Sequence, residues 1–251
     1  MMQFQKSRQI STTVIVPAYN EEDGLPVTLD KLQKVLDDSY EVIVVDDGST
    51  DRTLEVACRF SCQFARRFSC RFIRHEVNQG KGEALRTGIK HARGHNVIWI
   101  DADDTYPVET IPRMVEALNA YDVVVGSRAY GNENIPRFNR LGNWVFRTMI
   151  KVLYGFQAHD PCTGLYGARK VYLELMDLSS KRFAIEPEIS IKSSRMKLKT
   201  LDIPLRYRPR IGDSKLNAIQ VGYEDLKTIL GLVFWRGKVN DAAHAAGTAA
   251  K

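Results

Sequence analysis

Two acidic residues follow directly after a short, uninterrupted apolar run. The run, Asn96–Ile100, is predicted to be a buried strand, and Asp101-Ala102-Asp103 stands where that strand ends in a loop. Carboxylates in such a place are energetically costly unless a cation compensates their charge. Mg²⁺ and Mn²⁺ prefer hard oxygen ligands of this kind and leave coordination positions for water and a diphosphate. The sequence therefore predicts a divalent-metal site with Asp101 and Asp103 as ligands.

Short apolar runs alternate with helical patterns through the first half of the chain. The predicted strands are residues 13–16, 41–45, 72–74, 96–100 and 123–125. The predicted helices are residues 21–36, a helix after Ser49 or Thr50, residues 81–92 and residues 107–120. This alternation indicates an α/β fold with a Rossmann-like, mostly parallel sheet and helices on both faces.

Three polar clusters come at the ends of predicted strands. They are residues 17–21, 46–49 and 101–104. In sheets of this kind, ligands bind outside the carboxyl ends of the strands. We therefore expect the three clusters to meet at one edge of the sheet and to form one site.

Composition restricts the class of protein. The chain has 251 residues, of which 44% are hydrophobic and 26% are charged, which is typical of a globular protein. We expect no transmembrane helix, because no apolar stretch of about 18 residues lacks charges. We expect no signal peptide, because the N-terminus has no apolar core. The four cysteines are then predicted to be reduced thiols in a cytosolic protein.

Charge is divided unevenly between the two halves. Residues 1–127 contain 15 Lys and Arg against 19 Asp and Glu, whereas residues 128–251 contain 21 against 11. The net charges are therefore −4 and +10. A basic half suits phosphorylated ligands or an anionic membrane. It also suits nucleic acid, but interleaved aromatic stacking motifs are not evident, so we do not expect nucleic-acid binding.

Two amphipathic stretches follow in the basic half. Residues 138–156 and 217–235 each combine apolar side chains with cations, which suits a helix in a membrane interface and equally a helix packed on the domain. We predict one domain over residues 1–235. Its donor-binding half is 12–128 and its acceptor- and membrane-facing half is 129–235. The alanine-rich tail, 236–251, is predicted to be disordered.

An eight-residue segment occurs twice in succession. Residues 59–66 and 67–74 are identical at six of eight positions. We interpret the repeat as a small duplication that lengthens the second helix or its exit loop, away from the strand ends, and assign it no function.

Seven blocks in order resemble the family 2 glycosyltransferases with the GT-A fold, and among them the dolichol-phosphate and polyprenyl-phosphate sugar transferases. The blocks are Val16-Pro17-Ala18-Tyr19-Asn20-Glu21, Val44-Val45-Asp46-Asp47-Gly48-Ser49-Thr50-Asp51, Asn78-Gln79-Gly80-Lys81-Gly82, Asp101-Ala102-Asp103-Asp104-Thr105-Tyr106-Pro107, Gly126-Ser127-Arg128, Cys162-Thr163-Gly164 and Gly212-Asp213-Ser214-Lys215. The resemblance covers about residues 12–230.

The resemblance implies a nucleotide-sugar site and a catalytic set. The implied nucleotide-sugar-binding residues are Pro17, Tyr19, Glu21, Asp46, Asp47, Lys81, Asp101, Ala102, Asp103 and Arg128. One Asp of the Asp46-Asp47 pair is expected to accept from the base, and the sequence does not choose between them. The implied catalytic residues are Asp103, Arg128, Arg208, Arg210 and Lys215. Asp103 is expected to hold Mg²⁺ or Mn²⁺, and the cations are expected to clamp phosphates.

The function implied by the resemblance is inverting transfer of a hexose from a nucleotide sugar to a polyprenyl or dolichyl phosphate. The donor is of the UDP-glucose type or GDP-mannose, and Thr105, where mannosyltransferase relatives can carry Gln, favours the former. We expect peripheral attachment to the cytoplasmic face of a membrane, with a homo-oligomer or a membrane-protein partner as further options. The alternatives are a family 2 enzyme with a soluble acceptor and a nucleotide-sugar-binding module without turnover.

Overall fold

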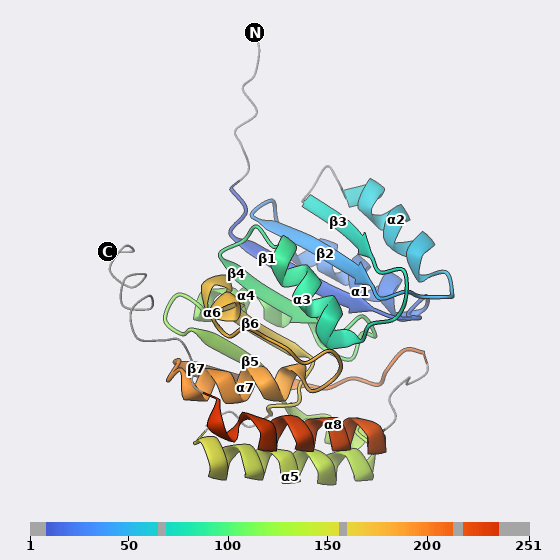
Figure 1. Cartoon of the computed structure of the whole chain (residues 1–251). Coiled ribbons are helices and arrows are strands. Elements are labelled where there is room, and N and C mark those ends of the chain that lie inside the picture. Colours follow the sequence, from blue (N-terminus) through green and yellow to red (C-terminus); the bar gives the residue numbers. More distant parts are fainter. Residues whose placement is uncertain (1–8, 65–68, 156–159, 213–217, 236–251) are drawn as a thin grey trace.

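A seven-stranded sheet forms the centre of the molecule (Figure 1). The computed structural model describes residues 9–64, 69–155, 160–212 and 218–235. The strands are β1 (Thr12–Ala18), β2 (Tyr40–Asp46), β3 (Ser69–Arg74), β4 (Asn96–Ile100), β5 (Val123–Tyr130), β6 (Leu165–Arg169) and β7 (Thr200–Arg206). Their order is β3-β2-β1-β4-β6-β5-β7, and among them only β6 runs antiparallel to its neighbours. The predicted mostly parallel α/β sheet is confirmed.

The parallel pairing brings the polar clusters to one edge. Ala18 at the end of β1 pairs with Asp46 at the end of β2, and Ile15 in β1 pairs with Trp99 in β4. The residues that follow β1, β2 and β4 therefore leave the sheet on the same side. The strands are continuous apolar runs because both faces of the sheet are covered by helices.

Helices cover both faces of the sheet and bury two hydrophobic clusters. On one face lie α1 (Gly24–Val35), α2 (Thr53–Phe64), the 3₁₀ turn η1 (Val108–Thr110) and α4 (Ile111–Ala117). On the other face lie α3 (Lys81–His91), α6 (Lys170–Leu175) and α7 (Ile185–Arg195). In α1 the buried residues Leu25, Leu29 and Leu32 recur at helical spacing, which explains the face that it turns to the sheet.

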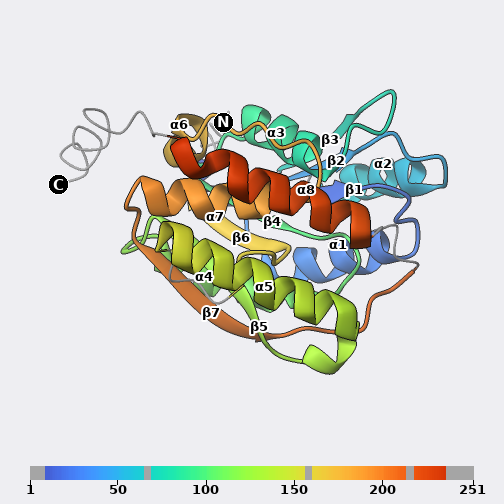
Figure 2. The same ribbon diagram turned by 60° about the horizontal axis from the view of Figure 1, so that its bottom comes forward.

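Two long helices add an outer layer beyond α7. They are α5 (Arg137–Tyr154), which follows the short turn η2 (Asn132–Asn134), and α8 (Ala218–Gly231), which ends in η3 (Leu232–Phe234). Helices α5 and α8 contact each other and both contact α7, and Figure 2 shows them side by side on the face that it brings forward. Within the described ranges, no helix combines the length and the apolarity that crossing a membrane requires.

Several predicted boundaries differ from the structure. The helix predicted at 21–36 begins at Gly24, because Glu21 donates its backbone N–H to the hydroxyl of Thr53 rather than entering the helix. The helix predicted at 107–120 divides into η1 and α4. The strand predicted at 123–125 extends to Tyr130, because β7 pairs along it.

The interpretation of the repeat was wrong in one respect. The first copy does lie in α2 as far as Phe64, but the second copy forms β3 from Ser69. Its last residue, Arg74, pairs with Asp46 and so stands at the strand ends rather than away from them. The cause is tertiary: β2 offers an open edge, and the second copy completes a parallel ladder there.

Candidate functional site

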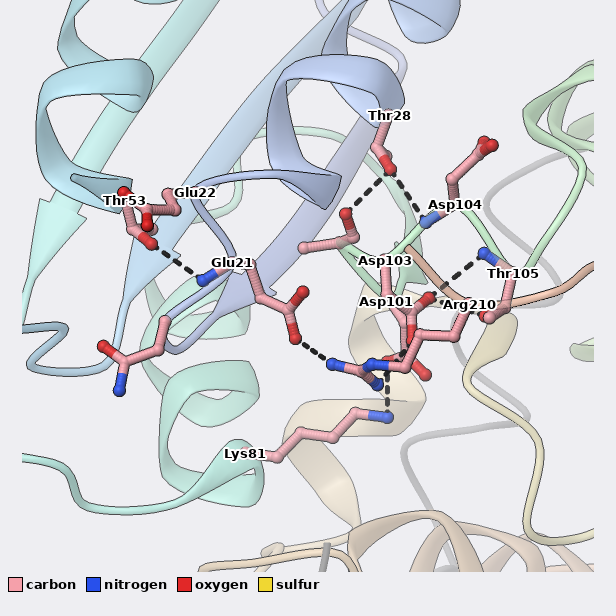
Figure 3. A network of polar contacts seen from close by, with 12 residues as sticks. Glu21, Glu22, Thr28, Thr53, Lys81, Asp101, Asp103, Asp104, Thr105 and Arg210 are labelled. Carbon is pink, nitrogen blue, oxygen red and sulfur yellow. Dashed lines mark hydrogen bonds and ion pairs between the residues drawn. The ribbon is translucent and has the colours of Figure 1, made fainter. Parts of the chain in front are cut away.

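Asp103 lies buried at the carboxyl edge of the sheet, where its two carboxylate oxygens have different partners. Oδ1 accepts hydrogen bonds from the Thr105 hydroxyl at 2.6 Å and from the Thr105 backbone N–H at 3.1 Å. Oδ2 accepts from Arg210 Nη1 at 2.7 Å. The other terminal nitrogen of Arg210 contacts Glu21, so one guanidinium joins two carboxylates from two strand ends (Figure 3).

Burial and charge act against each other on Asp103. Burial raises the pKa of its carboxyl above the ordinary value, and neighbouring Asp101 raises it further. Arg210 and the two hydrogen bonds from Thr105 lower it. The carboxylate thus depends on a nearby cation, as expected for a charge removed from water.

Asp101 is paired with a lysine from the neighbouring loop. Lys81, the first residue of α3, places Nζ 2.6 Å from Asp101 Oδ1 and 2.6 Å from Glu186 Oε1. Burial would lower the pKa of Lys81, but the two carboxylates outweigh burial and raise it. Lys81 is therefore a fixed positive charge beneath the acidic loop.

Glycines allow this loop to approach its neighbours. A Cβ atom on Gly164 would lie 1.9 Å from Asp101 Oδ2, and a Cβ atom on Gly24 would lie 2.9 Å from the carbonyl oxygen of Ala102. That carbonyl also accepts from the Thr28 hydroxyl at 2.9 Å. Ala102 itself is buried, so its contribution to the site is through its backbone.

Asp46 and Asp47 are both buried but have different surroundings. Asp47 accepts from the backbone N–H groups of Gln79 at 2.9 Å and Gly80 at 2.7 Å, and it contacts His75 Nδ1 at 2.7 Å. Asp46 Oδ1 accepts from the backbone of Ser49 at 3.0 Å. Asp46 Oδ2 has only an ion-pair contact with Arg74 at 3.5 Å and no hydrogen-bond partner among the described residues. Asp47 thus holds the loop before α3, whereas Asp46 keeps an acceptor available.

The first polar cluster surrounds the end of β1. Pro17 is buried within β1, and Tyr19 is half-buried just beyond it. Asn20 adopts a left-handed backbone conformation with φ of 53°, and its side-chain oxygen accepts from the Thr50 N–H at 2.8 Å. The turn directs the Glu21 carboxylate to Arg210.

Arg128, at the end of β5, is held by a buried carboxylate. Its Nε and Nη2 donate to Asp160 at 2.6 and 2.7 Å, and Nη2 also donates to the carbonyl of Cys162 at 3.0 Å. The guanidinium carbon lies 5.6 Å from the centre of the Tyr207 ring. Arg128 is thus fixed in place and lies beside a cavity.

That cavity has a volume of about 650 Å³ and separates α5 from the ends of β5 and β7. Its lining includes Arg128, Arg140, Asn143, Trp144, Arg147 and Asp160. Tyr207 and Tyr106 lie between Arg128 and the acidic loop, with ring centres 5.3 Å apart. The Tyr106 hydroxyl accepts from the Gly164 N–H at 2.7 Å. This cavity adjoins the acidic edge, and we call it the basic cavity because its three arginines outnumber its two carboxylates, Asp160 and Asp202.

The segment after β7 lies across the acidic loop. Arg208 donates its backbone N–H to Thr105 at 2.9 Å, and Ile211 donates to Asp103 at 3.1 Å. The Arg208 side chain lies 3.7 Å from Asp104 and 3.3 Å from Glu109. Lys215, also predicted as catalytic, lies outside the described residues, as does the tail predicted to be disordered.

Sequence reasoning did not single out Glu186, Asp160 or Tyr106 as site residues. Glu186 shares Lys81 with Asp101, although it stands on α7, and burial raises the pKa of its carboxyl while Lys81 lowers it. A sequence signal for it is Ile185-Glu186-Pro187-Glu188, where acidic and apolar residues alternate. Buried acids need partners, and that need points to a charged site.

The donor set fits a divalent cation that completes its coordination with a ligand. Asp101 and Asp103 supply hard carboxylate oxygens, and the Arg210 guanidinium already occupies a position that requires positive charge. Among the described residues, no group of three or more His, Cys, Asp or Glu side chains has a geometry that would hold a metal on its own. Oxygens from a diphosphate and water would have to supply the remaining ligands.

Comparison with known proteins gives consistent matches. The model of "Glycosyl transferase family 2" matches residues 13–176. The chain is 32% identical over 219 residues to a dolichyl-phosphate hexose transferase of Haloferax volcanii, covering 86% of this chain and 91% of the relative. It is 31% identical over 244 residues to a dolichol-phosphate mannosyltransferase of Pyrococcus furiosus, covering 92% of this chain and 66% of the relative.

Solved structures show the same fold. Glucosyl-3-phosphoglycerate synthase of Mycobacterium tuberculosis, crystallised with Mn²⁺, UDP and phosphoglyceric acid, superposes with a TM-score of 0.73. The match covers 89% of this chain and 78% of that one at 23% identity. At this identity the likeness shows the shared GT-A architecture.

Proposed function

We propose that this chain, which belongs to glycosyl transferase family 2, transfers a hexose from a nucleotide sugar to a polyprenyl or dolichyl phosphate. The observation that carries the proposal is the adjacency of two sites: the Asp101/Asp103 edge, and the basic cavity that lies against the amphipathic helix α5. The names of the Haloferax and Pyrococcus relatives, a dolichyl-phosphate hexose transferase and a dolichol-phosphate mannosyltransferase, support the same acceptor class.

We place the nucleotide base beside Asp46 and Tyr19. Asp46 Oδ2 is a buried acceptor without a hydrogen-bond partner among the described residues, and uracil and guanine both offer a ring N–H to such an acceptor. Tyr19 is half-buried, follows Ala18, which pairs with Asp46, and offers a ring face. Asp47 then shapes the loop rather than contacting the base. We assign Pro17 and Glu21, on either side of Tyr19 in the sequence, to the same base-binding region.

The diphosphate is assigned to the space between Asp103 and the cations Lys81, Arg208 and Arg210. Asp103 and Asp101 would hold Mg²⁺ or Mn²⁺, which would supply positive charge to the departing nucleoside diphosphate. Lys81 holds Asp101 at 2.6 Å, and the Thr105 hydroxyl orients Asp103. Preorganised charge of this kind lowers the barrier most where charge develops in the transition state.

The acceptor phosphate is assigned to the cavity beside α5. Arg140 and Arg147 line it, and Arg128 contributes positive potential from its wall while Asp160 keeps its orientation. In the transfer step an oxygen of the acceptor phosphate forms a bond to the anomeric carbon. The bond from that carbon to the nucleoside diphosphate breaks, and the electron pair leaves with the diphosphate. The phosphate is already ionised near neutral pH, so no general base is needed, and direct attack inverts the anomeric configuration.

The acceptor class explains the exposed apolar surface of α5 and α8. Phe138, Val145 and Val152 recur every seven residues on α5 and are 64%, 36% and 76% exposed. On α8, Ile219, Tyr223 and Leu230 are also exposed. Since α5 carries Arg137, Arg140, Arg147 and Lys151 as well, it suits the boundary of an anionic membrane. We therefore place the enzyme on a membrane surface, on its cytoplasmic face.

A transfer assay tests the proposal. UDP- and GDP-sugars are supplied singly with Mg²⁺ or Mn²⁺, with and without polyprenyl phosphate in detergent, and release of the nucleoside diphosphate is measured. We expect release from one donor that requires the lipid phosphate and is lost in Asp103→Asn. Release that is independent of lipid would favour a soluble acceptor, and binding of the donor without release would favour a binding module.

A further inference from the structure

Arg210 covers the oxygen of Asp103 that Thr105 leaves available. The Thr105 hydroxyl and backbone N–H both bind Oδ1, and Arg210 Nη1 lies 2.7 Å from Oδ2. A divalent cation bound by Asp103 would use that same Oδ2 oxygen. A guanidinium and a divalent cation at the same oxygen repel each other, so each weakens the binding of the other.

The contacts of Arg210 leave one of its hydrogen-bond donors without a partner among the described residues. Its second terminal nitrogen contacts Glu21, but its Nε is buried and has no hydrogen-bond partner among the described residues. A guanidinium offers five donors in a fixed fork, which matches phosphate oxygens better than two carboxylates from separate strands. Arg210 would therefore gain hydrogen bonds by moving to an anionic ligand.

Its attachment to the fold permits such a move. The Arg210 side chain is 29% exposed, and the backbone on either side is held by two hydrogen bonds, from Arg208 to Thr105 and from Ile211 to Asp103. Gly212 follows with φ of 78°, and a Cβ atom added there would meet no other atom within 4 Å among the described residues. The guanidinium can leave Asp103 by side-chain rotation without unfolding β7.

We infer that Arg210 is an internal counter-ion that competes with the divalent cation for Asp103 and is released when a nucleoside diphosphate offers it a new partner. The inference rests on the proposed metal site. This competition makes the binding of metal and diphosphate cooperative. The metal alone must displace Arg210 from Asp103. When the diphosphate is also present, the metal replaces Arg210 at Asp103 and the diphosphate replaces Asp103 at Arg210. By linkage, UDP raises the affinity for Mn²⁺ and Mn²⁺ raises the affinity for UDP by the same factor.

The test measures Mn²⁺ binding directly, by the electron paramagnetic resonance signal of free Mn²⁺, with and without UDP. The variants are Arg210→Gln and, as a matched control, Arg208→Gln, which removes an equal charge from the same segment but not from Asp103. Without UDP we expect Arg210→Gln to bind Mn²⁺ about tenfold more tightly than the wild type, as loss of one charged hydrogen bond would give. We expect Arg208→Gln to change it by less than about threefold, the scale of an exposed ion pair. The gain from UDP should shrink in Arg210→Gln.

Each other outcome has a definite meaning. Equal tightening in both variants would indicate a general charge effect and would overturn the competition. If Arg210→Gln binds Mn²⁺ as tightly as the wild type or less tightly, the inference is overturned. If Asp103→Asn also abolishes the binding of Mn²⁺ seen in the wild type, the proposed metal site still stands. No Mn²⁺ binding by any variant with UDP present would overturn both.

Discussion

Thr105 and Arg210 divide the two carboxylate oxygens of Asp103 between them. This division turns a general acidic motif into an oriented ligand, because one oxygen is fixed and the other faces the site. Thr105 stands two residues after Asp103 in the loop that follows β4. In this chain its hydroxyl acts through Asp103 rather than facing the site itself. The residue two positions after Asp103 therefore determines how the proposed metal ligand is held.

Gly164 sets the position of Asp101. We expect Gly164→Ala to reduce transfer at least about tenfold, because the new methyl group would overlap Asp101 Oδ2, and displacements of about 1 Å at a site have effects of this size. Gly142→Ala on α5 is the control, since among the described residues its Cβ would meet only Phe146, at 4.0 Å. Turnover measured with saturating donor, alongside thermal melting, checks the prediction. Wild-type turnover in a folded Gly164→Ala protein would contradict it.

Asp46 and Asp47 can be separated by matched amide substitutions. Asp46→Asn places an N–H₂ donor toward the base, so we expect UDP or GDP binding to weaken about 10- to 100-fold with the fold intact. Asp47→Asn removes acceptors for the Gln79 and Gly80 N–H groups, so we expect a loss of stability of about 1–3 kcal/mol. Calorimetric titration and denaturant unfolding distinguish these effects. Reversed results would assign the base contact to Asp47.

At the scale of elements, α2 and β3 show that local sequence alone does not determine whether a segment forms a helix or a strand. The two copies of the repeat share six of eight residues, yet one ends a helix and the other forms a strand. The second copy forms a strand because β2 offers its edge. Helices with an apolar stripe, such as α1, were predictable because their spacing matches the face that they bury.

Helix α5 is the element that the proposed function assigns to the membrane. We expect the double variant Phe138→Glu/Val152→Glu to lose binding to vesicles that contain anionic lipid, because each exposed apolar side chain contributes about 1–2 kcal/mol on insertion. Transfer to a short-chain, water-soluble acceptor phosphate should persist, since neither residue lines the cavity. Vesicle co-sedimentation and the two transfer assays measure this. Unchanged vesicle binding would remove α5 from the membrane contact.

At the scale of the whole molecule, the sequence predicted which residues meet at the carboxyl ends of the strands but not the order of the strands in the sheet. Periodicity placed β1, β2 and β4, and parallel topology brought Asp46, Asp101 and Glu21 to one edge. The antiparallel insertion of β6 between β4 and β5 was not predictable, because it depends on contacts distant in sequence. For the same reason Glu186 and Asp160 were missed: each acquires its role only when α7 or the loop before β6 lies beside a cation.

Asp225 links the stability of the whole fold to pH. It is buried on α8, its Oδ1 has no hydrogen-bond partner within the described ranges, and burial, with Glu186 and Glu224 nearby, raises its pKa from 3.8 to about 7. Between about pH 4 and pH 7 the folded protein therefore holds a proton that the unfolded chain has lost. The stability that the protonated carboxyl of Asp225 contributes is fully present below about pH 4. It falls as the pH rises from about 4 to about 7 and stays constant above that.

We expect Asp225→Asn to remove this pH dependence, because an amide stays neutral at every pH. At pH 8 the variant should be more stable than the wild type by about 1–3 kcal/mol, a discounted fraction of the raised pKa, and at pH 4 the two should be equal. Denaturant unfolding at the two pH values measures the difference. Glu224→Gln, one residue earlier on α8, is the comparison: it removes one of the charges that raise the pKa of Asp225, so it should raise stability at pH 8 by less than Asp225→Asn does and change it little at pH 4. A variant that is less stable than the wild type at pH 8 would show that the Asp225 carboxylate has a partner that offsets its burial.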